Sequence, residues 1–126
     1  MKTPYSYDYT PPAPILLVGL AAPEQAPQVS LQPALIDTGA DGTFVPTALL
    51  ERLQVPVIYA TNVRSHLGQD VRRVPVHRVD ILLDSVRVPG VEVVSDDWGD
   101  EIILGRNALN KLELFLDGPH QITRLE

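Results

Sequence analysis

The chain has 126 residues, no cysteine and a formal net charge of −6 at pH 7. This length suits one domain and is too short for two lobes, and an apolar fraction of 44% excludes wholesale disorder. The negative charge and the scattered basic residues argue against a nucleic-acid partner. Without cysteine there is no disulfide framework, thiolate nucleophile or cysteine-based metal site. No apolar run is long enough to span a bilayer, so we expect no membrane partner and a cytoplasmic location.

The composition predicts a mainly β fold. The chain holds twelve prolines and eight glycines among short valine-rich runs, and both residues punctuate strands and are poor in helix interiors. Residues 1–14 contain four prolines and three tyrosines, which favours an extended N-terminal arm that is disordered or docks on a partner subunit. Residues 15–126 then form the single folded domain.

The first half of the domain is predicted to contain two strands, a polar loop and a short helix. The second strand runs directly into the turn-rich loop 37–42, and Pro46 suits the first turn of a helix because its missing N–H costs nothing there. Leu49, Leu50 and Leu53 then share one helical face. The predicted strands are 15–20 and 29–36, the turn between them is 23–27, and the helix is 46–53.

The second half is predicted to hold a hairpin, further strands and a second short helix. Between residues 57 and 76, two strands flank Ser65-His66-Leu67-Gly68-Gln69, with Gly68 at the hairpin tip. Beyond it, apolar residues alternate with polar ones, and Asp84-Ser85 and Pro89-Gly90 interrupt the alternation. We expect strands at 79–83, 86–88, 91–93, 101–104, 112–116 and 121–125, a helix at 106–112 and a turn at 117–120.

Asp37 is the most informative residue. It follows the apolar run Ala34-Leu35-Ile36, so a carboxylate stands at the end of a buried strand, which is an unusual place for an acid. Taken alone, Asp37-Thr38-Gly39 is explained as well by a turn or a helix cap as by chemistry. Other motifs in the sequence are needed to distinguish a turn or cap from a catalytic carboxylate.

Two stretches resemble the signatures of the retropepsin family of aspartic peptidases. Residues 34–43, Ala-Leu-Ile-Asp-Thr-Gly-Ala-Asp-Gly-Thr, resemble its active-site loop, and residues 102–109, Ile-Ile-Leu-Gly-Arg-Asn-Ala-Leu, resemble its second signature. They flank a glycine-containing hairpin, as in the family, and Asp117-Gly118-Pro119 after a strand resembles the end of the single-domain bacterial members. The resemblance implies a mainly β, single-domain acid protease barrel with one or two short helices.

The resemblance implies an aspartic endopeptidase in which Asp37, Thr38 and Gly39 are catalytic. Peptide hydrolysis by this route needs two carboxyls that share one proton. The sequence holds no second Asp-Thr-Gly or Asp-Ser-Gly, so the other carboxyl must come from a second copy of the chain. In the family, the residue at Thr38 hydrogen-bonds across the dimer axis, and Gly39 lets the backbone approach the substrate. We therefore expect a homodimer that cleaves a peptide or protein substrate.

The same resemblance assigns substrate contacts in the loop and in the hairpin. The hairpin, residues 62–72, would be the flap that closes over the peptide. A plain sheet hairpin with ordinary surface side chains is the alternative. The residues expected to bind the substrate are Ala40, Asp41, His66, Leu67 and Gly68.

Gly105 and Arg106 are expected to support the loop. Gly105 would let its strand pass tightly against the loop that carries Asp37. Asp41 and Arg106 resemble the family's internal carboxylate–guanidinium pair, and we expect that pair to be buried and costly to break. An ordinary helix-start glycine and a solvated charge pair are the alternatives.

Other polar groups indicate no second site. The three histidines, His66, His77 and His120, show no metal-ligand spacing, and the acidic loop 96–100 lacks the pattern of a calcium loop. Trp98 is expected to pack or to anchor its loop. We expect neither a metal nor another cofactor. The alternative to the peptidase is a retropepsin-like peptide-binding or dimerisation module with weak or absent activity.

Overall fold

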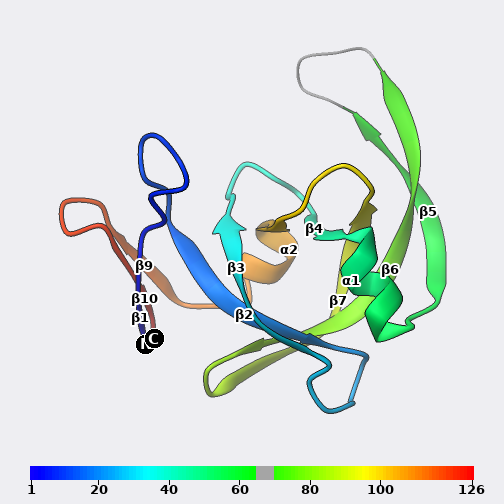
Figure 1. Ribbon diagram of the computed structural model, residues 1–126, viewed down its shortest axis with the longest axis horizontal. Coiled ribbons are helices and arrows are strands. Elements are labelled where there is room, and N and C mark those ends of the chain that lie inside the picture. The colour runs from blue at the N-terminus through cyan, green and yellow to red at the C-terminus, as the bar shows by residue number, and fades with distance from the viewer. Residues whose placement is uncertain (65–69) are drawn as a thin grey trace.

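The computed structural model describes residues 1–64 and 70–126, and six of its strands close a barrel (Figure 1). Around the ring, the order is β2 (Ile15–Ala21), β3 (Val29–Ile36), β8 (Ile102–Leu104), β4 (Thr43–Pro46), β7 (Val86–Asp96) and β6 (Val71–Leu83). Antiparallel pairing of β2 with β6 closes the ring, and β5 (Val57–Arg64) extends the sheet by pairing with β6. The expected mainly β barrel is confirmed.

The two ends of the chain form a separate three-stranded sheet with the order β1 (Lys2–Pro4), β10 (Ile122–Leu125) and β9 (Leu114–Asp117). The ends lie side by side, and the Met1 ammonium donates to the Leu125 carbonyl at 3.1 Å (Figure 1). The sequence predicts an arm that is disordered or lies on a partner. In the structure the arm pairs within its own chain, because β10 offers β1 a free edge.

The barrel is filled by inward-facing side chains from its strands. On β6, Val79, Ile81 and Leu83 are at most 1% exposed, as their position at every second residue of a strand predicts. The helix α1 (Thr47–Leu53) adds Leu50 and Leu53, which are 2% exposed, and its bounds agree with the predicted helix. Burying each leucine stabilises the fold by about 1.5–3 kcal/mol.

Three predicted boundaries are wrong, and the first is the start of the strand expected at 79–83, which belongs to the continuous β6 (Val71–Leu83). The second helix, α2 (Arg106–Leu109), is shorter than predicted, because the N–H groups of Lys111 and Leu112 bond carbonyls three residues back, as in a tight turn. The predicted break at Pro89-Gly90 lies inside the continuous strand β7. In the described part of the chain, no helix is long and apolar enough to cross a membrane.

A β-bulge explains why β7 continues through Pro89-Gly90. The pairing of β6 with β7 shifts between Val79↔Val91 and Ile81↔Val88, so one residue of β6 faces two of β7. Gly90 has a φ of 62°, a value that favours glycine. The bulge therefore accommodates residues that would otherwise end the strand.

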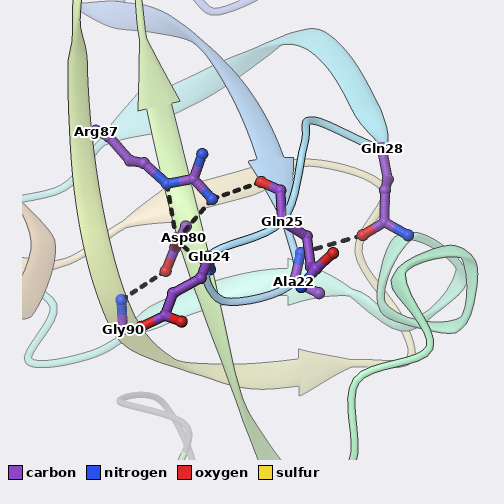
Figure 2. Close-up of polar contacts among 7 residues, drawn as sticks. All are labelled: Ala22, Glu24, Gln25, Gln28, Asp80, Arg87 and Gly90. Carbon is purple, nitrogen blue, oxygen red and sulfur yellow. Dashed lines mark hydrogen bonds and ion pairs between the residues drawn. The ribbon is translucent and has the colours of Figure 1, made fainter.

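Asp80 fills this bulge with its carboxylate (Figure 2). Its side chain accepts the N–H of Gly90 at 2.8 Å, the N–H of Glu24 at 2.9 Å and Nε–H of Arg87 at 2.8 Å. Arg87 also donates to the Gln25 carbonyl at 2.6 Å. Burial alone raises the pKa of Asp80, but these hydrogen bonds outweigh burial and hold the pKa below its ordinary value. The network ties the turn before β3 and the bulge of β7 to β6.

Candidate active site

Asp37 stands where β3 leaves the sheet. β3 runs parallel to β8 with Ile36 opposite Leu104, and the N–H of Asp37 still donates to the Leu104 carbonyl at 3.0 Å. The Asp37 side chain turns toward the loop, where its Oδ1 accepts the N–H of Gly39 at 3.0 Å. Two barrel strands thus present a half-buried carboxylate at the start of the loop.

The loop 37–42 rests directly on Gly105. A Cβ atom added at Gly105 would lie 2.5 Å from the carbonyl carbon of Gly42 and 3.0 Å from the carbonyl oxygen of Ala40, and both are backbone atoms. The φ of Gly105 is −91°, which any residue adopts, so glycine is required here by space and not by conformation. The N–H of Arg106 donates to the Ala40 carbonyl at 2.8 Å. No side chain fits between the loop and this segment.

Arg106 also holds the loop by its side chain. One guanidinium nitrogen donates to the Thr38 carbonyl at 2.8 Å, and another pairs with Asp41 Oδ1. The pair exists, but the expectation that it is buried is wrong, because the side chains of Asp41 and Arg106 are 93% and 46% exposed. The pair lies on the surface of the chain, where water solvates both charges. An exposed pair contributes about 0–1 kcal/mol.

Thr43 and Asn107 hold the same loop from inside, a role that sequence reasoning missed. Thr43 is 0% exposed, and its hydroxyl donates to Asn107 Oδ1 at 2.7 Å and accepts the N–H of Gly105 at 3.1 Å. Asn107 Nδ2 donates to the Glu92 carbonyl at 2.8 Å. A signal existed, because Thr43 and Val45 alternate on β4 and a threonine at a core position needs a partner for its hydroxyl.

A groove of about 1070 Å³ opens beside Asp37. Its lining comes from the loop, from β5 and from the bulged part of β7, and the loop residues in it are Asp37, Gly39, Ala40, Asp41 and Gly42. Thr38 is exposed beside the groove, while Gly105 and Arg106 contact the loop. The expected substrate contacts at His66, Leu67 and Gly68 lie outside the described residues.

The groove lining includes three carboxylates, Asp37, Asp41 and Glu92, which differ in their partners. Asp41 pairs with Arg106, and Glu92 accepts a hydrogen bond from the Tyr59 hydroxyl. That hydrogen bond, followed by burial, raises the pKa of Tyr59. In the described part of the chain, Asp37 accepts the N–H of Gly39 alone, so its Oδ2 has no protein partner there.

The comparison with known families decides the class of protein. The family model described as gag-polyprotein putative aspartyl protease matches residues 30–111. The chain belongs to this aspartyl protease family. The matched segment contains the Asp37 loop and the residues Gly105 and Arg106 that contact it, so the resemblance of the two signatures is confirmed. None of the curated proteins matches the chain.

Solved structures of aspartic proteases share the fold. The retropepsin-like aspartic protease from Rickettsia conorii has a TM-score of 0.68 at 10% identity, over 99% of this chain and 88% of that one. EIAV protease with a bound inhibitor has a TM-score of 0.60 at 20% identity, over 86% of this chain and 93% of that one. The chain spans 12% of the foamy viral protease-reverse transcriptase, with a TM-score of 0.55 at 17% identity and 78% of this chain covered. At these identities the likeness establishes the retropepsin-like fold.

Proposed function

We propose that the chain is one subunit of a homodimeric aspartic endopeptidase, in which two copies of Asp37 activate water to hydrolyse a peptide bond. The observation that carries the proposal is the placement of Asp37 beside a groove of about 1070 Å³, with one carboxylate oxygen held by the N–H of Gly39. The family match supports the same class of chemistry. The catalytic set is then Asp37, Thr38 and Gly39.

The chemistry requires one proton shared by the two Asp37 carboxyls, because like charges a few ångström apart do not both ionise readily. The ionised carboxylate removes a proton from water, whose oxygen attacks the scissile carbonyl carbon. The protonated carboxyl gives its proton to the carbonyl oxygen, which forms a tetrahedral diol. One carboxyl then protonates the departing nitrogen while the other recovers a proton from a diol hydroxyl, so the C–N bond breaks and the shared proton is restored.

The contacts beneath the loop suit this role. Two carboxyls that share a proton must stay within hydrogen-bond reach, so the loops that carry them have to be rigid. Gly105 and the buried Thr43 hold the loop from inside. Arg106 donates a hydrogen bond to the Thr38 carbonyl, and Thr38 itself is exposed. This arrangement leaves the Thr38 hydroxyl available to a second copy of the chain.

The terminal sheet supplies a surface for the second copy. β9 is one of the two edge strands of that sheet among the described residues, and its Phe115 and Leu116 are 49% and 44% exposed. Large apolar side chains on an unpaired edge favour pairing with another chain. A light-scattering mass of one subunit in a fully active preparation would refute the homodimer.

The hairpin of β5 and β6 is proposed to cover the bound peptide as a flap. Tyr59 and residues 61–64 of β5 line the groove, and this supports the proposal that the strand lies beside an extended peptide. Substrate contacts at His66, Leu67 and Gly68 stay predictions, as does the expectation of no nucleic-acid partner and no cofactor.

Peptide-library cleavage between about pH 4 and 7 tests the proposed function. We expect a bell-shaped profile with its maximum on the acidic side of neutrality, because the rate falls when the second carboxyl gains a proton and again when the shared proton leaves. A peptide mimic with a hydroxyl in place of the attacked carbonyl should inhibit. A folded dimer that binds library peptides and cleaves none of them would support the peptide-binding module instead.

A further inference from the structure

The hairpin of β5 and β6 projects beyond the barrel (Figure 1). β6 first pairs with β7 at Val76↔Val94, so residues 71–75 pair with β5 alone in the described structure. Two-stranded ribbons are marginally stable in water unless a further contact holds them. Because residues 61–64 of this ribbon line the groove, its position sets the shape of the groove.

The loop between β7 and β8 has an anchored backbone and carries an exposed aromatic ring, that of Trp98. Asp96 Oδ1 accepts the N–H groups of Trp98 and Gly99, each at 3.0 Å, and Asp97 accepts the Thr47 hydroxyl at 2.6 Å. A Cβ atom at Gly99 would collide with the Asp96 carboxylate, so the turn is closely packed. The loop is thus anchored to itself and to α1, and yet the Trp98 side chain is 76% exposed.

Arg72 connects the projecting ribbon to this loop. Its guanidinium carbon lies 3.6 Å from the centroid of the Trp98 ring, as in a cation–π stack. Arg72 is paired with Val63, and residues 61–64 of that strand line the groove. The contact therefore acts on the part of the ribbon that borders the groove. The loop also carries Asp96, Asp97 and Asp100, whose charges favour a nearby cation.

We propose that Arg72 and Trp98 form a clasp that sets the position of the β5–β6 ribbon over the groove, so that both are positioning residues for peptide binding. This inference rests on the proposed peptidase function, because it takes the groove to be the peptide site. Without the clasp the ribbon samples more orientations, and a peptide must select those that line the groove. An exposed cation–π contact shifts such a population about two- to five-fold, or about 0.5–1 kcal/mol.

Hydrogen exchange tests the clasp independently of catalysis. In the full chain, Arg72→Gln and Trp98→Leu should each speed amide exchange in residues 59–64 and 71–75 about two- to five-fold. Trp98→Phe keeps an aromatic face and should retain most of the protection. The double variant should exchange no faster than the faster single variant, because both changes remove one contact. Unchanged exchange in Arg72→Gln and Trp98→Leu overturns the clasp.

Arg73→Gln is the matched control. Arg73 is the next residue on the same strand, points to the opposite face and contacts Asn62 at 3.4 Å. Its loss removes the same charge from the ribbon without touching Trp98, so exchange should stay at the wild-type rate. Acceleration by Arg73→Gln equal to that by Arg72→Gln would show a general charge effect and overturn the specific contact.

Peptide binding tests the positioning role. Arg72→Gln should raise KM for a cleaved library peptide about two- to five-fold and leave kcat near the wild-type value, while Arg73→Gln changes neither. If exchange responds but KM does not, the positioning role is overturned. If exchange responds and the wild type neither binds nor cleaves any peptide, the clasp is supported as a property of the fold and the peptidase proposal is the one that fails.

Discussion

Two aspartate–arginine pairs differ sharply in the exposure of their carboxylates. Asp80 and Arg87 lie in the barrel wall, where the Asp80 side chain is 2% exposed, whereas Asp41 and Arg106 lie at the Asp37 loop, where the Asp41 side chain is 93% exposed. Asp80 also accepts two backbone N–H groups (Figure 2). The described structure gives the Asp41 side chain one partner, Arg106.

The difference shows that the surroundings of an ion pair decide what it contributes. Water replaces either partner of an exposed pair at little cost, but removing a buried carboxylate leaves donors that water cannot reach. The Asp37 loop is therefore held mainly by uncharged contacts, namely the fit over Gly105 and the buried hydroxyl of Thr43. We expect the loop to depend on this packing more than on its salt bridge.

The largest effect is expected at Asp80. Asp80→Ala removes the acceptor of two backbone N–H groups and of Arg87, so the free energy of unfolding should fall by about 3–5 kcal/mol. Denaturant titration measures this, with Glu51→Ala as the control because Glu51 is an exposed carboxylate on α1. If Asp80→Ala lowers the free energy of unfolding by less than about 1 kcal/mol, the buried pair contributes no more than an exposed one, which would contradict the account.

Gly105→Ala should have the next largest effect on stability and a severe effect on catalysis. The added methyl meets the backbone of Gly42 and Ala40, which must shift, at a cost of about 1–3 kcal/mol. Because that backbone continues from Asp37, peptide cleavage should fall as well. Gly118→Ala is the control, since nothing lies near a Cβ atom there. Wild-type stability and activity in Gly105→Ala would contradict the close packing of the loop.

The charge of Asp80 should also make the free energy of unfolding depend on pH, and this effect should be smaller. The folded pKa of Asp80 lies below the ordinary value of 3.8, so the fold favours the ionised form. This contribution is present above about pH 4 and is lost as the pH falls through the folded pKa. Below pH 4, the wild type should therefore lose stability more steeply than Asp80→Asn, which has no carboxylate to protonate. Parallel stability curves for the two proteins would argue against an ionised Asp80.

The smallest effect is expected at the exposed pair. A double-mutant cycle of Asp41→Ala and Arg106→Ala should give a coupling of about 0–1 kcal/mol that falls as salt is added. Arg106→Ala alone should cost more than Asp41→Ala, because it also removes the hydrogen bond to the Thr38 carbonyl. A coupling of about 3 kcal/mol or more would mean that the pair is buried in the assembled protein.

Local pattern was enough to predict a mainly β fold and the turn-rich Asp37 loop, whereas the barrel and the approach of Gly105 followed from the resemblance to the family. Apolar alternation marks the buried faces of strands, and a carboxylate after an apolar run is rare enough to be noticed. The two family signatures then predicted that segments far apart in the chain lie close together in the fold. The partnership of Asp41 with Arg106 followed from them, and the structure shows that contact.

Burial and long-range partners could not be predicted in the same way. Asp80 lies between Val79 and Ile81, where alternation places it on the solvent face, and a distant turn through Glu24 covers it. Pro89-Gly90 suggests a break between strands, but β7 continues through it because the bulge lets two residues of β7 face one of β6. The exposure of Asp41 depends on the shape of the finished surface, and no local pattern encodes that shape.

The most direct test of the central claim, that two subunits share one catalytic pair, is a subunit-mixing experiment. Wild-type chain is refolded with a three-fold excess of Asp37→Asn, which keeps the shape of the loop but lacks the carboxyl. A wild-type subunit then meets a wild-type partner about one time in four, so activity per wild-type subunit should fall to about a quarter, while pure Asp37→Asn forms inactive dimers. Undiminished activity per wild-type subunit, or cleavage by Asp37→Asn at the wild-type rate, would contradict the shared Asp37 pair.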